Sequence, residues 1–414
     1  MAGIYIHIPF CRSRCIYCGF YSTTALELRQ RYVDALCREM EIRGMWKEKC
    51  GRRNDEEIET IYLGGGTPSQ LTSSQLSQLF IYINKVYNIS PSSFLVPPSP
   101  TKEITIEVNP DDVTVEFAAV LQQLPINRVS MGIQTFDDQR LRFLHRRHTA
   151  RQAIEAVSIL RSAGINNLSI DLMYGFPGET LSDWQSDIST ALSLNVEHLS
   201  AYCLMIEEGT PLHRMLKQHN GDCPLCEQRS ELQGDCPQCV DEETERQMYY
   251  TLIDRLTAAG YEHYEISNFA KLPPPTGGVR GGPSPFRSRH NSNYWNGTPY
   301  IGLGAAAHSY DIRTRSWNIA DINAYIEGIG RGERRFEEEI LDDDTRYNDA
   351  VTVGLRTCEG INLDTLPKKY RDYCIKNARR YLDDGLLELT TQHLHLTRRG
   401  LFVSDMVMSD LIMI

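Results

Sequence analysis

The 414-residue sequence has no segment of the kind that enters or crosses a membrane. It opens directly into a strand-like run, Ile4 to Phe10, and has no positively charged region followed by a long apolar core, so we predict no signal peptide. No apolar stretch reaches the length of a membrane-spanning helix. Twelve cysteines in a chain without these signals indicate a reducing cytoplasm, where thiols are available to bind metals. We therefore expect a cytoplasmic protein.

Clustered positive charge is also missing. The formal net charge is -11, and basic runs such as Arg146-Arg147-His148 are short. Because phosphate binding needs clustered positive charge, we expect no nucleic-acid partner. The composition is otherwise ordinary for a folded chain, with 41% hydrophobic and 23% charged residues, which argues against disorder. The length exceeds that of one compact core, so two or three domains are expected.

Three of the twelve cysteines lie within eight residues, in the segment Cys11-Arg-Ser-Arg-Cys15-Ile-Tyr-Cys18. A structural zinc site needs four protein ligands, and a disulfide would leave one of three thiols unpaired. A 4Fe-4S cluster fits better, because three thiolates leave its fourth iron open to a small molecule. We interpret the segment as a cluster-binding loop. The alternative is three ordinary thiols in a surface loop.

The CxxxCxxC spacing of this loop resembles that of the radical S-adenosylmethionine (SAM) superfamily. The resemblance implies that the amino and carboxylate groups of SAM chelate the free iron. It also implies that electron transfer cleaves the sulfonium to a 5'-deoxyadenosyl radical, and that Tyr17 lies near the adenine.

Short apolar runs alternate with longer amphipathic segments from Ile4 to about Met205, the pattern of repeated strand-helix units around a parallel sheet. Six such units predict an α/β fold with a partial (β/α)6 barrel. The predicted strands are Ile4 to Ile8, Thr60 to Leu63, Ile104 to Val108, Arg128 to Ile133, Leu168 to Met173 and His198 to Leu204. The predicted helices include Leu26 to Gly44, Ser73 to Val86, Ala150 to Ala163 and Ser182 to Leu194.

Polar and glycine residues stand at the ends of these predicted strands. Gly64-Gly65-Gly66-Thr67 follows the second strand, where bare backbone can approach a ligand, although a glycine run is often only a tight turn. Glu107 and Asn109 end the third strand, Gln134 follows the fourth, and Asp171 lies on the fifth. Because the carboxyl ends of parallel strands meet at one edge, these side chains are expected to point into one cavity.

Six phrases narrow the resemblance further: IYIHIPFC, GGGTPS, EVNPDD, RVSMGIQTF, LHRRHTARQA and SIDLMYGFPGET. Together they resemble the family of oxygen-independent coproporphyrinogen III oxidases and their close relatives, the radical SAM heme chaperones, over nearly the whole chain. The resemblance implies a 4Fe-4S cluster on Cys11, Cys15 and Cys18, and an electron donor of the flavodoxin or ferredoxin type. Matching positions imply SAM contacts at Tyr5, Tyr17, Gly65, Gly66, Thr67, Glu107, Gln134, Arg146 and Asp171. Some of these contacts serve a second SAM in the oxidase.

Three features separate the oxidase branch from the chaperone branch. The oxidase motif continues to a fourth cysteine, whereas Cys18 is followed here by Gly19 and Phe20. The oxidase carries a long segment ahead of its cluster, whereas ten residues precede Cys11 here. Finally, Arg289-His-Asn-Ser-Asn-Tyr-Trp295 matches the HNxxYW signature of the chaperones. We therefore predict a chaperone that delivers heme to an unidentified acceptor, membrane-associated acceptors included, and expect no coproporphyrinogen oxidase activity.

A heme site needs an imidazole for axial ligation and flat aromatic rings against the macrocycle. His290, Tyr294 and Trp295 supply such groups, and Asn291 belongs to the same signature. The alternative is that His290 and Trp295 only pack a domain junction. His308, among small residues, is a weaker second candidate for the iron.

Four further cysteines form two CPxC hooks between Leu212 and Gln247, in a stretch that looks inserted relative to the family. Two such hooks resemble zinc ribbons and rubredoxin, in which paired turns complete a tetrahedral site. We favour structural zinc over an iron centre or unmetallated thiols, and the proposed ligands are Cys223, Cys226, Cys236 and Cys239. The other five cysteines are scattered and are expected to be core or surface thiols: Cys37, Cys50, Cys203, Cys358 and Cys374.

Four segments are therefore predicted: the barrel at 1–212, the inserted hooks at 213–247, a barrel-completing region at 248–335 and a C-terminal domain at 336–414. The last resembles the family's small winged-helix-like domain, mostly helical with strands at Leu386 to Leu389 and Leu394 to Leu396. Without a basic face it is expected to pack against the barrel or contact a protein, not DNA. Residues 91–102 and 271–287 are predicted to be loops.

Overall fold

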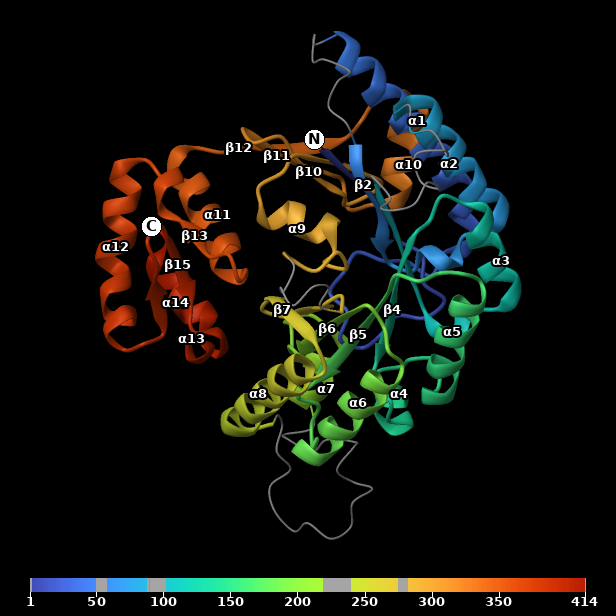
Figure 1. The fold of residues 1–414 in the computed structure, drawn as a ribbon. Coiled ribbons are helices and arrows are strands. Elements are labelled where there is room, and N and C mark those ends of the chain that lie inside the picture. Colours follow the sequence, from blue (N-terminus) through green and yellow to red (C-terminus); the bar gives the residue numbers. More distant parts are fainter. Residues whose placement is uncertain are drawn as a thin grey trace.

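The computed structural model describes residues 2–49, 58–87, 89, 102–218, 240–274 and 282–413. Its centre is a curved parallel sheet of six strands that follow one another in sequence order (Figure 1). The strands are β1 (Ala2–Ile8), β2 (Ile58–Gly65), β3 (Glu103–Val108), β4 (Arg128–Gln134), β5 (Leu168–Tyr174) and β6 (His198–Cys203). Each lies within a few residues of its predicted bounds. The α/β partial-barrel prediction is confirmed.

Helices cover the outer face of these strands (Figure 1). They are α1 (Arg29–Lys49), α2 (Ser73–Tyr87), α3 (Val115–Gln123), α4 (Asp138–Phe143), α5 (Ala150–Ser162) and α6 (Leu181–Ser193). Leu63, Ile106 and Ile170 point toward these helices and are fully buried in the main hydrophobic core. Alternate residues face the interior of the barrel instead, and many of those are polar. Thr180 starts α6 with a reciprocal capping box, as its place before the apolar run predicts.

Further strands extend the sheet on both sides. Beyond β1 lie β9 (Tyr300–Leu303), β10 (His308–Tyr310), β11 (Thr314–Asn318) and β12 (Phe336–Ile340), and beyond β6 lie β8 (Asn268–Lys271) and β7 (Tyr261–Glu265). Strand β9 runs parallel to β1, and the outer strands are antiparallel. The helices that accompany them are α7 (Pro211–Gln218), α8 (Glu242–Ala258), α9 (Arg289–Trp295) and α10 (Ile322–Gly330).

The C-terminal unit has a core of its own, and Figure 1 shows it beside the sheet. Its elements are α11 (Asp343–Arg356), β13 (Ile361–Asn362), α12 (Lys368–Asp383), β14 (Leu387–Leu389), β15 (His393–Leu396), α13 (Arg398–Phe402) and α14 (Ser404–Leu411). Strands β14 and β15 form the predicted hairpin. Strand β12, within the segment predicted to open this domain, pairs instead with β11 in the large sheet.

The C-terminal unit is joined to the barrel by backbone bonds and ion pairs. Ile266 N–H donates to Arg356 O over 3.0 Å, and Cys358 N–H donates to Tyr264 O over 3.0 Å. Arg356 also pairs over 2.8 Å with the buried carboxylate of Glu265. The unit therefore packs against the barrel, as expected.

Several sequence predictions fall outside the described residues, namely the four CPxC cysteines, Cys50, residues 91–101 of the first predicted loop and residues 275–281 of the second. None of the described helices combines the length and apolar character needed to cross a bilayer.

Candidate functional site

The cysteine segment forms a loop at the carboxyl end of β1. Cys11 N–H donates to Thr23 O over 2.9 Å, and Thr23 N–H donates to Pro9 O over 2.7 Å, which closes the base of the loop. Ile16, buried between the second and third cysteines, bonds through its backbone to Leu144 and Leu212. The three thiols are free and partly exposed. The loop thus holds its cysteines at the barrel end without pairing them.

Polar side chains connect two of these cysteines through the ends of β2, β3 and β4. Thr67 Oγ1 lies 3.4 Å from Cys11 Sγ and accepts a 3.2 Å hydrogen bond from Asn109 Nδ2. Arg146 donates from Nη2 to Asn109 Oδ1 over 2.8 Å and from Nη1 to Cys15 Sγ over 3.6 Å. Arg146 also donates to the Gly132 carbonyl. We call this chain, Cys11-Thr67-Asn109-Arg146-Cys15, the polar bridge.

The glycine run at the end of β2 allows close contact between neighbouring backbone segments. Gly65 has φ +107, and a Cβ there would lie 2.3 Å from His7 Nδ1. A Cβ on Gly66 would lie 2.7 Å from the Pro9 carbonyl carbon, while its N–H donates to Ile8 O over 2.9 Å. The glycines therefore let the end of β2 press against the end of β1, which brings Thr67 beside Cys11.

Glu107 lies at the centre of a buried group inside the barrel. It accepts from Tyr62 OH over 2.7 Å and from Gly65 N–H over 3.0 Å. Burial, then the nearby Asp171, raises the pKa of Glu107 to about 7. The Tyr5 ring stacks on Tyr62 and bonds to His7 Nδ1 over 3.0 Å. A carboxyl group held this way exchanges a proton near neutral pH.

Asp171 and Gln134 face the same interior from β5 and β4. Asp171 receives long 3.5 Å bonds from Ser130 Oγ, and burial raises its pKa to about 6. Gln134 has φ 72 at a bulge, and a Cβ on Gly132 would lie 2.8 Å from its Nε2. Side chains predicted from four strand ends thus face one interior.

Desolvation also affects the ionisation of Tyr17 and of two of the three thiols. Desolvation raises the pKa values of Cys11, Cys18 and Tyr17 above their ordinary values. Tyr17 packs against a small apolar cluster that contains Ile16 and Leu144. The nearby Arg146 lowers the pKa of Tyr17, and Cys15 raises it.

The donor set fits a cubane cluster. Within the described ranges, no three His, Cys, Asp or Glu side chains are grouped so that they could hold a metal ion. A 4Fe-4S cluster makes a different demand, because each thiolate binds a different iron and the sulfurs need not converge on one point. Three free thiols on one loop, with a guanidinium beside Cys15, supply the required ligands and a compensating charge.

The HNxxYW segment forms α9, which closes the opposite, amino end of the same strands. The backbone N–H groups of Arg289 and His290 donate to Glu103 at the start of β3 over 3.1 and 3.0 Å. The imidazole of His290 lies 3.3 Å from where a Cβ on Gly3, near the start of β1, would stand. The cysteine loop and α9 therefore lie at opposite ends of the strands, and the two groups of predicted site residues meet in the interior, where the rings of Tyr5 and Tyr62 stack on His290.

His290 is only 1% exposed, and both of its ring nitrogens have partners. Nδ1 lies 2.9 Å from Thr60 Oγ1, and Nε2 lies 2.9 Å from Tyr294 OH. The ring stacks on Tyr62 at 5.0 Å, and burial lowers its pKa to about 3, so the imidazole is neutral. Tyr294 and Trp295 are partly exposed and contact Tyr300 and Tyr264. Asn291 is partly exposed, and its N–H caps onto Ser288.

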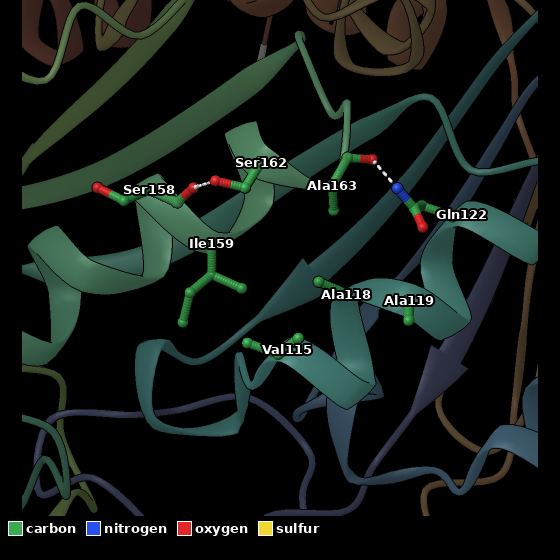
Figure 2. Close-up of a pocket in the computed structure, with 8 residues that line it drawn as sticks. All are labelled: Val115, Ala118, Ala119, Gln122, Ser158, Ile159, Ser162 and Ala163. Carbon is green, nitrogen blue, oxygen red and sulfur yellow. Dashed lines mark hydrogen bonds between the residues drawn. The ribbon is translucent and has the colours of Figure 1, made fainter.

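A shallow cavity of about 320 Å³ lies between α3 and α5 (Figure 2). Small and apolar side chains line it, including Val115, Ala118 and Ile159. It contains no titratable or metal-binding group, so it offers nothing for the chemistry predicted from the sequence.

Sequence reasoning placed Asn109 at a strand end without a role, and it missed Thr60, Glu103 and His7. Asn109 stands two residues after Glu107 in the phrase EVNPDD, which is the signal that could have assigned it to the polar bridge. Nothing local marks Thr60 and Glu103, because these partners are 186 or more residues away.

Comparison with known families gives two matches. Residues 5–191 match the radical SAM superfamily, and residues 341–403 match the HemN C-terminal domain. The fold is similar to that of coproporphyrinogen III oxidase (HemN) from Escherichia coli, with a TM-score of 0.73. That similarity covers 99% of this chain and 90% of the other at 19% identity, so it concerns the fold alone.

Curated relatives cover the chain from end to end. The heme chaperone HemW of Bacillus subtilis (strain 168) is 31% identical over 98% of this chain and 98% of its own length. HemW of Lactococcus lactis (strain IL1403) is 30% identical over 96% of this chain and 93% of its own. HemW of Mycobacterium tuberculosis (strain H37Rv) is 31% identical over 99% and 94%.

Proposed function

This chain belongs to the HemW family of radical SAM proteins, and on that premise we propose that it is a heme chaperone. It binds heme and transfers it to an acceptor protein in the cytoplasm, and it carries a SAM-binding 4Fe-4S cluster. The observation that carries the proposal is the polar bridge, which fixes two of the three free thiols at the barrel end.

Cys11, Cys15 and Cys18 would hold the cluster. When bound, the cluster supplies the electron for reductive cleavage of SAM, from a donor of the flavodoxin or ferredoxin type. Two side chains of the protein contact the cysteines that would bind the cluster. Arg146 places a positive charge beside Cys15, and Thr67 presents its hydroxyl to Cys11.

The proposed SAM contacts surround the loop and the barrel interior next to it. The carboxylates of Glu107 and Asp171 accept hydrogen bonds from hydroxyl or ammonium groups, and Gln134 adds an amide. The remaining members of this set are Tyr5, Tyr17, Gly65, Gly66, Thr67 and Arg146. Thr67 and Gln134 are buried and the other members are partly exposed, so a ligand can reach this set.

The HNxxYW segment stays proposed as part of the heme site. Its partly exposed Tyr294 and Trp295 supply the flat rings that a macrocycle needs. His290 supports them from within, since its buried ring holds Tyr294 through Nε2.

The experiment is an anaerobic heme titration of the reconstituted protein, with and without SAM, paired with an oxidase assay. We expect saturable heme binding and no protoporphyrinogen IX from coproporphyrinogen III, SAM and reductant. Formation of that product would overturn the chaperone proposal in favour of radical oxidative decarboxylation. An absence of both would point to another substrate for the radical.

We also propose structural zinc on Cys223, Cys226, Cys236 and Cys239. The spacing of the two CPxC hooks supports it, because each hook aims two thiolates at one metal. Metal analysis of anaerobically purified protein tests this. Zinc well below one atom per chain contradicts the proposal.

A further inference from the structure

His308, at the start of β10, differs from the other histidines of the barrel interior. Its side chain is exposed, and no hydrogen bond engages its ring among the described residues. The nitrogens of His7 and His290 are all occupied, by Tyr5, Tyr21, Thr60 and Tyr294. A lone pair on His308 is therefore available to an incoming ligand.

The neighbours of His308 form an aromatic surface. Trp317 lies opposite His308 in the β10-β11 ladder, and the two rings stack at 5.6 Å and 24°. Tyr310 follows on the same face, 6.2 Å from Tyr300, which in turn contacts Tyr294 of α9 at 4.6 Å. We call this surface, His308 with Trp317, Tyr310 and Tyr300, the aromatic face.

The strand alternation sets which way the aromatic face points. Ser309, between His308 and Tyr310, accepts from Arg43 of α1 over 3.2 Å, so it points toward the outer helices. His308 and Tyr310 therefore point to the opposite side, the one that Tyr300 faces. The electrostatic influence of His308 on His7 agrees with this placement.

The turn that carries His308 is held rigidly. Gly304 has φ +102, and a Cβ there would lie 2.4 Å from Tyr32 OH. Tyr32 OH accepts from Ala305 N–H, and buried Glu39 accepts from Gly304 N–H, each over 2.9 Å. Ala306 adopts φ 59, a strained conformation for a residue with a side chain. Such strain concentrates where a side chain must be presented in one direction.

We propose that His308 binds the heme iron, that the stacked Trp317 orients the imidazole, and that Tyr310 and Tyr300 contact the macrocycle. The inference rests on the proposed function and names the site of that cargo. Ligation needs a neutral imidazole, and the exposed His308 offers one without breaking any bond in the structure. Ligation by His290 would require that ring to lose Thr60 or Tyr294.

The charged groups beside the aromatic face are paired with one another. Arg315 lies on this face of β11, two residues before Trp317, and pairs with Asp349 over 2.7 Å and with Glu339 of β12 over 3.6 Å. Trp317 Nε1 donates to Glu337 of β12 over 3.1 Å.

The test is a titration of the full-length, cluster-reconstituted protein with ferric heme, read by absorption and resonance Raman spectra. His308→Ala should weaken heme binding by about ten-fold or more, because outer-shell losses alone cost metal sites that much. Added imidazole should restore the histidine-ligated spectrum. His308→Tyr should instead give the spectrum of a phenolate-ligated heme, since tyrosine also binds ferric iron.

The matched control is His393→Ala, in β15 of the C-terminal unit, which should bind heme as the unmodified chain does. If the unmodified chain binds no heme, the proposed function itself fails. If it binds heme and both His308 variants keep its affinity and spectrum, the function stands and this assignment is overturned. Should His308→Ala fail to fold, the ligand change in His308→Tyr decides.

Discussion

The two ends of strands β1 to β3 carry similar polar side chains and use them differently. At the amino end, Thr60 and Glu103 bind the imidazole and backbone of α9, and His290 has a partner at each nitrogen. At the carboxyl end, the three thiols form no disulfide, and the polar bridge contacts two of them. An imidazole with a partner at both nitrogens has no lone pair for a ligand, whereas thiols outside any disulfide stay available to a metal.

The same contrast separates the two histidines considered for heme. His290 is buried in the closed end, and His308 is exposed on a strand beside the open one. A motif match favours His290, and the availability of a lone pair favours His308. Four measurements would break or sharpen this comparison.

The largest effect is expected at the open end. Cys15→Ala should abolish the cluster, because one iron loses its thiolate, while the fold remains because the partly exposed thiol makes one long hydrogen bond, from Arg146. Iron and sulfide content after anaerobic reconstitution measures the loss. Cys358→Ala, at an exposed cysteine, is the control and should keep the full content. Equal iron in both variants would remove the loop from the cluster site.

His290→Ala should lower the free energy of unfolding by about 3 kcal/mol, because it empties a buried ring site and removes the hydrogen bonds that the ring makes with Thr60 and Tyr294. Urea unfolding measures it. The exposed His308→Ala should change stability by less than about 0.5 kcal/mol. Similar losses of stability in both variants would contradict the conclusion that His290 is held by buried hydrogen bonds and His308 is not.

Glu107 should make stability depend on pH. Its pKa is about 7 in the folded protein against an ordinary 4.5, so the folded protein holds a proton that the unfolded chain has lost between these values. The free energy of unfolding should therefore fall as pH rises through this window, by up to about 3 kcal/mol.

In Glu107→Gln this fall should be much smaller, because the amide does not titrate. Urea unfolding at pH 5.5 and pH 7.5 compares the two proteins. A fall of equal size in the variant would assign the dependence to other groups, first of all to Asp171, whose pKa is raised to about 6.

The smallest effect is expected from the polar bridge. Asn109→Ala removes the link between Thr67 and Arg146 and should cost about 1 kcal/mol of stability, the usual value for a hydrogen bond. Iron content should stay near that of the unmodified chain. A loss of iron as large as that in Cys15→Ala would show that the bridge is required for cluster assembly.

Local patterns determined the elements of the barrel and the cluster loop. The alternation of short apolar runs with longer amphipathic segments placed six strands within a few residues of their bounds, because strands and helices differ in length and in apolar period. The three cysteines lie within eight residues, so their chemistry could be inferred from spacing alone. The glycine run was also visible, although its packing against His7 and Pro9 was not.

Only the tertiary structure decided which end of the barrel each group occupies. His290 meets Thr60 across 230 residues, and Arg146 meets Cys15 across 131, distances at which no sequence period operates. The orientation of His308 depends on its strand pairing with Trp317 and on the turn held by Glu39 and Tyr32. Spacing reports which chemistry a chain carries, but whether a nitrogen is buried or available depends on what long-range packing places beside it.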